Sequence, residues 1–92
     1  MHLDELRDLM VATYGEQDFD RGVPATIAWI AEEVGELAQA VRKGTREEQL
    51  HELGDVLAWI ASLAAQLDLS MEEAVQRYAD GCPKCGTRPC SC

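Results

Sequence analysis

The chain has 92 residues, enough for one small domain. The hydrophobic core of so short a chain gives only marginal stability unless a metal, a disulfide or a partner subunit stabilises the fold further. Seventeen acidic residues against eight basic ones give a formal charge of −9, which disfavours binding to nucleic-acid polymers. The acidic excess favours a cation site instead. With no signal-peptide pattern and no membrane-length apolar run, we expect a cytoplasmic protein that does not bind membranes.

Two helices are predicted in the first half of the chain. Residues 3–14 have helical apolar spacing, and Gly15 is expected to end this helix, followed by a polar loop over residues 16–22. Pro24 suits the first turn of a second helix that extends to Lys43 and ends at Gly44. The apolar stripe of this second helix consists of Ile27, Ile30, Val34, Leu37 and Val41.

Two more helices open with capping-box patterns. Thr45 with Glu48 begins a helix that reaches about residue 67, and Ser70 with Glu73 begins a short one that reaches about residue 80. The stripe of the third helix consists of Leu50, Leu53, Leu57, Ile60, Ala64 and Leu67. No strand pattern competes, so the prediction is an all-α, four-helix domain over residues 1–80 with these stripes in its core.

Two pairs of carboxylates repeat one spacing on neighbouring helices. Glu33 with Glu36, and Glu52 with Asp55, are each three residues apart, which places each pair within ~60° on one helical face. Antiparallel packing would bring all four together, where they would repel one another unless a cation lay between them. Oxygen ligands without a histidine in register favour magnesium or manganese over zinc, copper or iron. The alternative is that these are ordinary solvated helix faces.

These acidic positions carry a family resemblance. Glu32-Glu33-Val34-Gly35-Glu36 followed by Glu52-Leu53-Gly54-Asp55 resembles the EExxE and ExxD motif of MazG-type nucleotide pyrophosphohydrolases. The resemblance implies an all-α fold that associates into homodimers or homotetramers. It also implies magnesium-dependent cleavage of a nucleoside triphosphate into a monophosphate and pyrophosphate.

The same resemblance implies roles for the acidic residues. Glu33, Glu36, Glu52 and Asp55 would be the magnesium ligands, and Glu32 or Glu33 the general base. Phosphoribosyl-ATP pyrophosphatase, a relative with this fold, would differ in substrate only. The competing hypothesis is a non-catalytic helical interaction module whose acidic face is simply solvated.

Three further residues are possible substrate contacts. Trp29 and Trp59 are at helical spacing from the carboxylates, where an indole can stack on a nucleobase. Packing at a core edge or subunit interface is the alternative for both tryptophans. By the loose resemblance of the last helix, Arg77 is the basic residue expected nearest the metal. The other basic residues that are candidates for phosphate contacts are Arg21, Arg42, Lys43, Arg46, Lys84 and Arg88, of which Arg42 and Lys43 are better explained as charges at a helix C-terminus.

A cysteine-rich tail occupies residues 81–92. The first pair, in Cys82-Pro83-Lys84-Cys85-Gly86, resembles a zinc knuckle, whereas the one-residue gap between Cys90 and Cys92 is tighter than in the usual zinc ribbon. Four thiolates in a reducing compartment favour a structural zinc site with Cys82, Cys85, Cys90 and Cys92 as ligands. Disulfides or redox-active thiols, and a disordered tail, are the alternatives.

Overall fold

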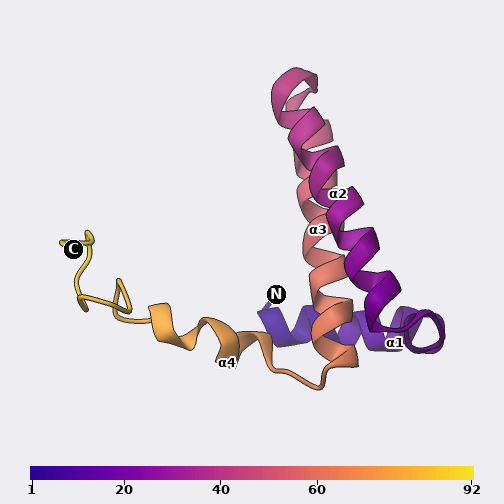
Figure 1. The fold of residues 1–92 in the computed structure, drawn as a ribbon, viewed down its shortest axis with the longest axis horizontal. Helices are drawn as coiled ribbons and strands as arrows, with labels where there is room; N and C mark the ends of the chain where they lie inside the picture. Colours follow the sequence, from indigo (N-terminus) through magenta and orange to yellow (C-terminus); the bar gives the residue numbers. More distant parts are fainter.

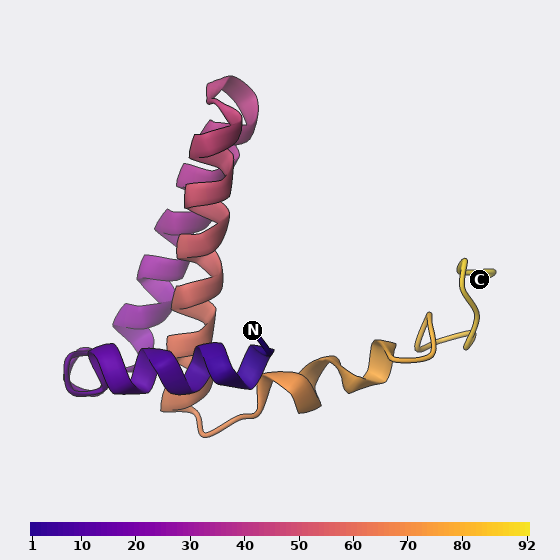
Figure 2. The same ribbon diagram turned by 180° about the vertical axis from the view of Figure 1, so that it is seen from behind.

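The computed structural model describes residues 1–92 as an all-α chain, as predicted (Figure 1). Its elements are the helices α1 (Leu3–Arg21), α2 (Val23–Lys43), α3 (Arg46–Gln66) and α4 (Met71–Val75), and the 3-10 helix η1 (Gln76–Tyr78). Helices α2 and α3 form a long antiparallel hairpin, and α1 lies across its open end (Figures 1 and 2). Helix α4 then leads the tail away from the hairpin.

The tight turn between α2 and α3 follows from two residues. The Gly44 N–H donates to the Ala40 carbonyl at 2.8 Å, and a Cβ at Gly44 would lie 2.8 Å from that same oxygen. Thr45 and Glu48 form the predicted capping box, with the Glu48 N–H donating to Thr45 Oγ1 at 3.1 Å and the Thr45 N–H to Glu48 Oε1 at 3.3 Å. These local contacts set where each carboxylate of the two helices lies.

Helix α1 is longer than the sequence predicts. It passes through Gly15 and ends at Gly22, whose φ of 82° and N–H bond to the Asp18 carbonyl form the actual C-terminal cap. A glycine inside a helix costs only about 1 kcal/mol. Packing of the second half of α1 on α3 outweighs that cost, and it buries Asp18, which pairs with Arg21 at 2.7 Å. The predicted loop over residues 16–22 is therefore wrong.

Helix α4 is shorter than predicted and packs against α1. It ends at Val75, and the 3-10 helix η1 continues the helical segment only to Tyr78, two residues short of the predicted end at residue 80. Asp4 of α1 accepts hydrogen bonds from the Ser70 hydroxyl at 2.6 Å and from the Met71 N–H at 2.7 Å. Because α4 lies against the start of α1, the four helices do not close into a bundle within one chain.

The apolar stripes of α2 and α3 lie largely on the surface, not in a core. Only four hydrophobic residues are buried: Ala40, Val56, Ala61 and Met71. The exposed stripe residues are Ile27, Val34, Val41, Leu50, Leu53, Leu57, Ile60 and Leu67. The radius of gyration is 15.3 Å, against about 12 Å for a compact domain of this length. The predicted core placement of these stripes is therefore wrong for the single chain.

None of the helices combines the length and apolar character needed to cross a membrane.

Candidate functional site

The facing sides of α2 and α3 carry polar and aromatic residues in successive layers. Near the base of the hairpin, Gln66 donates to Thr26 Oγ1 at 2.9 Å, which joins the end of α3 to the start of α2. One turn further, Trp29 and Trp59 stack with ring centroids 5.7 Å apart and planes 12° apart. The carboxylates occupy the next layers toward the tip. The helical periodicity of the sequence thus places the acidic pairs inside the hairpin.

Three carboxylates from the two helices converge. Oxygens of Glu33, Glu36 and Glu52 all lie within 4.8 Å of one another. Asp55 lies in an adjoining group with Glu52 and His51, and His51 Nε2 is 3.3 Å from Asp55 Oδ2. Glu52 belongs to both groups. The structure therefore brings the four predicted ligands into one acidic region, and it adds His51, to which the sequence analysis gave no role.

Two of these carboxylates have oxygens that the protein leaves without a partner. Glu33 Oε2 and Glu52 Oε2 are buried and have no hydrogen bond. Burial, and next the negative charge of Glu36, raise the pKa of Glu33. Burial, followed by a hydrogen bond with Glu36, raises the pKa of Glu52. Converging, unpaired carboxylate oxygens are the donor set that a hard divalent cation such as magnesium would satisfy, so these residues fit the expected ion.

Glu32 stands apart from this cluster. Its side chain is exposed, and it belongs to neither metal-capable group. As a general base, Glu32 would have to act from the edge of the site, whereas Glu33 lies within it.

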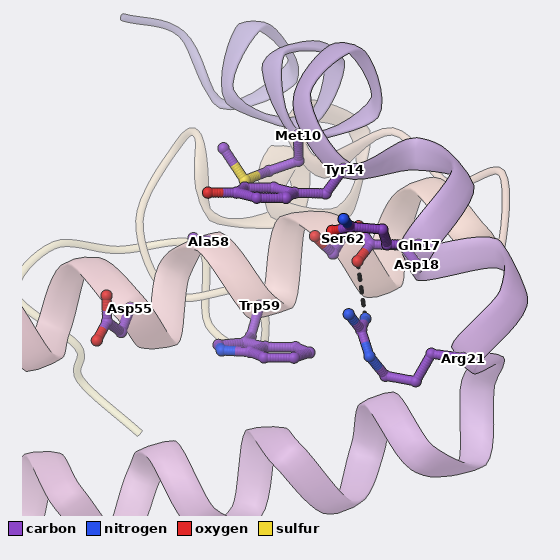
Figure 3. A pocket seen from close by; sticks show the side chains of 9 residues that line it. All are labelled: Met10, Tyr14, Gln17, Asp18, Arg21, Asp55, Ala58, Trp59 and Ser62. Carbon is purple, nitrogen blue, oxygen red and sulfur yellow. Dashed lines mark hydrogen bonds and ion pairs between the residues drawn. The ribbon is translucent and has the colours of Figure 1, made fainter.

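A cavity of about 320 Å³ opens between α1 and α3, beside Asp55 (Figure 3). Its wall includes the side chains of Tyr14, Asp18 and Trp59. The Arg21 guanidinium pairs with Asp18 and lies 4.6 Å from the centroid of the Trp59 ring. The cavity therefore combines aromatic surfaces and a fixed cation next to the acidic cluster.

Sequence reasoning missed most of this cavity. Tyr14 was assigned to the end of the first helix, and Asp18 to a loop. The i,i+3 spacing of Asp18 and Arg21 was the available signal, and it becomes informative only once α1 is extended through Gly15.

A second cavity, of about 340 Å³, lies on the other side of the cluster toward the hairpin tip. Glu36, Glu52 and Lys43 line it. Lys43, for which the sequence favoured only a helix C-terminal role, therefore places a positive charge near the carboxylates.

Arg77 is engaged elsewhere. Its guanidinium lies 4.9 Å from the Tyr78 ring centroid and donates to the Tyr78 hydroxyl at 3.0 Å. It lines neither cavity beside the carboxylates, so the structure gives no support to its predicted substrate contact.

The four cysteines form a separate cluster in the tail, with all Sγ atoms within 4.8 Å of one another. The Thr87 hydroxyl, followed by the Ser91 N–H, lowers the pKa of Cys85 to about 4. A thiolate is therefore the form of Cys85 at neutral pH.

Comparison with known families identifies a domain that the chain matches. The model of the MazG nucleotide pyrophosphohydrolase domain matches residues 21–88, which contain both carboxylate pairs. No curated protein matches this chain. The match extends beyond residue 80, so the division into residues 1–80 and 81–92 stays a prediction.

Proposed function

Because this chain belongs to the MazG nucleotide pyrophosphohydrolase family, we propose that it is a magnesium-dependent enzyme that hydrolyses nucleoside triphosphates to monophosphates and pyrophosphate. The observation that carries the proposal is the pair of buried oxygens, Glu33 Oε2 and Glu52 Oε2, that no protein group satisfies. A buried charged group without a partner is costly, and proteins retain such groups where a ligand completes them.

The ligands of the ion would be Glu33, Glu36, Glu52 and Asp55. When bound, magnesium or manganese supplies positive charge that offsets the charge developing on the phosphate oxygens. His51 Nε2 lies 3.3 Å from Asp55 Oδ2, next to the proposed ligand. A carboxylate oxygen of Glu33 or Glu32 would accept the proton of the attacking water. Glu33 is favoured because its carboxylate lies in the cluster.

The cavity between α1 and α3 is the proposed site of the nucleoside. Tyr14 and Trp59 offer aromatic surfaces on which a base can stack. Trp29 supports Trp59 from α2 through their stacking contact. Asp55 lies at the edge of this cavity, so a nucleoside there would direct its phosphates toward the carboxylates. Lys43, in the cavity beyond the cluster, would face the far end of the triphosphate.

We also propose that two or more copies of the chain associate. The exposed stripes of α2 and α3, together with the small core of the single chain, support burial against a second copy in a homodimer or homotetramer. The cytoplasmic location stays a prediction.

The proposed activity is tested by incubating the protein with each common ribonucleoside and deoxyribonucleoside triphosphate, with and without magnesium. Monophosphate and pyrophosphate are then separated by ion-exchange chromatography. We expect both products in equal amounts and only with the metal. Glu36→Gln should lower the rate by about 100-fold or more, because a metal ligand contributes several kcal/mol to transition-state stabilisation.

Glu47→Gln is the matched control, since it removes the same charge from an exposed position on α3 that lies outside both acidic groups. It should leave the rate within a factor of two or so. If the folded protein released no product from any nucleotide and bound no magnesium, the result would favour the alternative hypothesis of a non-catalytic helical interaction module.

A further inference from the structure

The tail lies at the end of the arm that α4 begins (Figure 1), and the Sγ atoms of its four cysteines all lie within 4.8 Å of one another. Their Sγ atoms are 3.4 Å apart for Cys90 and Cys92, 3.8 Å for Cys82 and Cys92, and 4.0 Å for Cys85 and Cys90. A tetrahedral zinc ion with Zn–S bonds of about 2.3 Å separates its sulfurs by about 3.8 Å. Bonded sulfurs lie at about 2.05 Å. The three distances are close to the separation of zinc-bound sulfurs and well beyond that of a disulfide.

The backbone of the tail is folded to present these sulfurs. The Gly86 N–H donates to the Cys82 carbonyl at 2.6 Å, and the Cys82 N–H donates to the Thr87 carbonyl at 2.9 Å, which closes a turn between the first two cysteines. Gly81 adopts a φ of 111°, and a Cβ there would lie 2.7 Å from the Thr87 oxygen. This close approach explains why a glycine precedes the first cysteine.

The second pair of cysteines is joined to the first through Cys85. The Ser91 N–H donates to Cys85 Sγ at 3.4 Å, and the Thr87 and Ser91 hydroxyls are 3.0 Å apart. Hydrogen bonds from backbone and hydroxyl groups to a ligand sulfur orient it and offset its negative charge. The geometry therefore links the two halves of the tail at the sulfur cluster.

Hydrophobic burial cannot hold this segment together. Residues 81–92 contain no aliphatic or aromatic side chain larger than proline. A segment this short without a core needs a crosslink or an ion to fix its shape.

We propose that residues 81–92 form a closed structural zinc site whose ligands are the thiolates of Cys82, Cys85, Cys90 and Cys92. Four sulfur ligands in a tetrahedral arrangement select zinc or iron over hard cations. All four positions are filled by the chain, so no position is left open for substrate, as in zinc sites that support structure. The carboxylate cluster and the thiolate cluster would thus bind different ions, because oxygen ligands favour magnesium and thiolates favour zinc.

The site is tested on the full chain produced in zinc-supplemented medium and purified under reducing conditions. Elemental analysis should find one zinc per chain. Replacement of zinc by cobalt should give the intense visible absorption of tetrahedral cobalt thiolate. Cys90→Ser should reduce zinc retention during dialysis against a chelator by at least about tenfold, whereas the adjacent Ser91→Ala should retain it.

Three results would overturn the proposal. These are iron in place of zinc, a mass four hydrogens lower with no titratable thiol, and four thiols that react freely in a protein that binds no zinc. Glu36→Gln should keep its full zinc content. The zinc measurement therefore tests the thiolate site alone, and its outcome does not depend on the proposed pyrophosphohydrolase activity.

Discussion

Glu52 contributes to the proposed metal site at the expense of the stability of the metal-free chain. Its Oε2 is buried without a partner and its pKa is raised. A carboxyl group with a raised folded-state pKa contributes stability that is fully present below its unfolded pKa and is lost as the pH rises through the folded value. Deprotonated Glu52 therefore destabilises the metal-free protein at neutral pH.

We expect Glu52→Gln to raise the melting temperature of the metal-free protein at pH 7. A neutral amide removes the buried charge and can donate a hydrogen bond to Glu36. The difference from the unsubstituted chain should vanish below about pH 4, where the carboxyl group is protonated in both states. Calorimetry across pH measures this effect.

If magnesium binds as proposed, it should stabilise the unsubstituted protein, since ligand binding to the folded state raises its stability, and the same variant should lose that stabilisation. Glu47→Gln should leave the response to magnesium unchanged. A Glu52→Gln protein that was less stable than the unsubstituted chain at pH 7 would contradict this account of the buried oxygen.

At the level of the elements, Asp4 is the principal connection between α1 and α4. Its two carboxylate oxygens accept from the Ser70 hydroxyl and the Met71 N–H, and Ser70 Oγ itself accepts from the Glu73 N–H at 3.1 Å. The bond from Ser70 is the largest cause that lowers the pKa of Asp4. This stabilisation is present above the unfolded pKa of Asp4 and is lost as the pH falls through the lower folded value.

Asp4→Ala should release α4 from α1. Hydrogen exchange at the Met71 amide should accelerate at neutral pH, while amides in the middle of α2 and α3 keep their protection. Asp8→Ala, one turn along α1, removes an exposed carboxylate paired only with Arg7 and should leave Met71 unchanged. Equal exchange in the two variants would show that other contacts hold α4.

For the whole molecule, the exposed apolar stripes are the dominant feature. Leu53 on α3 is 45% exposed and Val41 on α2 is 63% exposed. Such stripes are buried in stable helical proteins, and a second copy offers matching surfaces. A homodimer through these faces would supply the core that one chain lacks.

Leu53→Lys should therefore shift the protein toward the monomer in sedimentation equilibrium, and it should lower thermal stability because the single chain has so small a core. Glu16→Lys introduces the same lysine at an exposed position of α1, outside both stripes, and it should leave the association state unchanged. An unsubstituted protein that is monomeric at micromolar concentration would contradict the assembly.

The sequence by itself determined the local features. Thr45 with Glu48 and Gly44 fixed the hairpin turn, and the i,i+3 spacing of the acidic residues fixed their common face, because capping and helical periodicity depend on neighbours within one turn. These features sufficed to place Glu33, Glu36 and Glu52 together and to identify the family.

The length of α1, the cavity beside Asp55 and the exposure of the apolar stripes depend on residues distant in the sequence, so only the tertiary structure determined them. Packing of α1 on α3 carried the helix through Gly15 to Arg21 and created the cavity beside Asp55. The pairing of α2 with α3 through their polar and aromatic sides turned the apolar stripes outward. A stripe identifies which face of a helix prefers burial, but it does not say whether the covering surface comes from the same chain or from another.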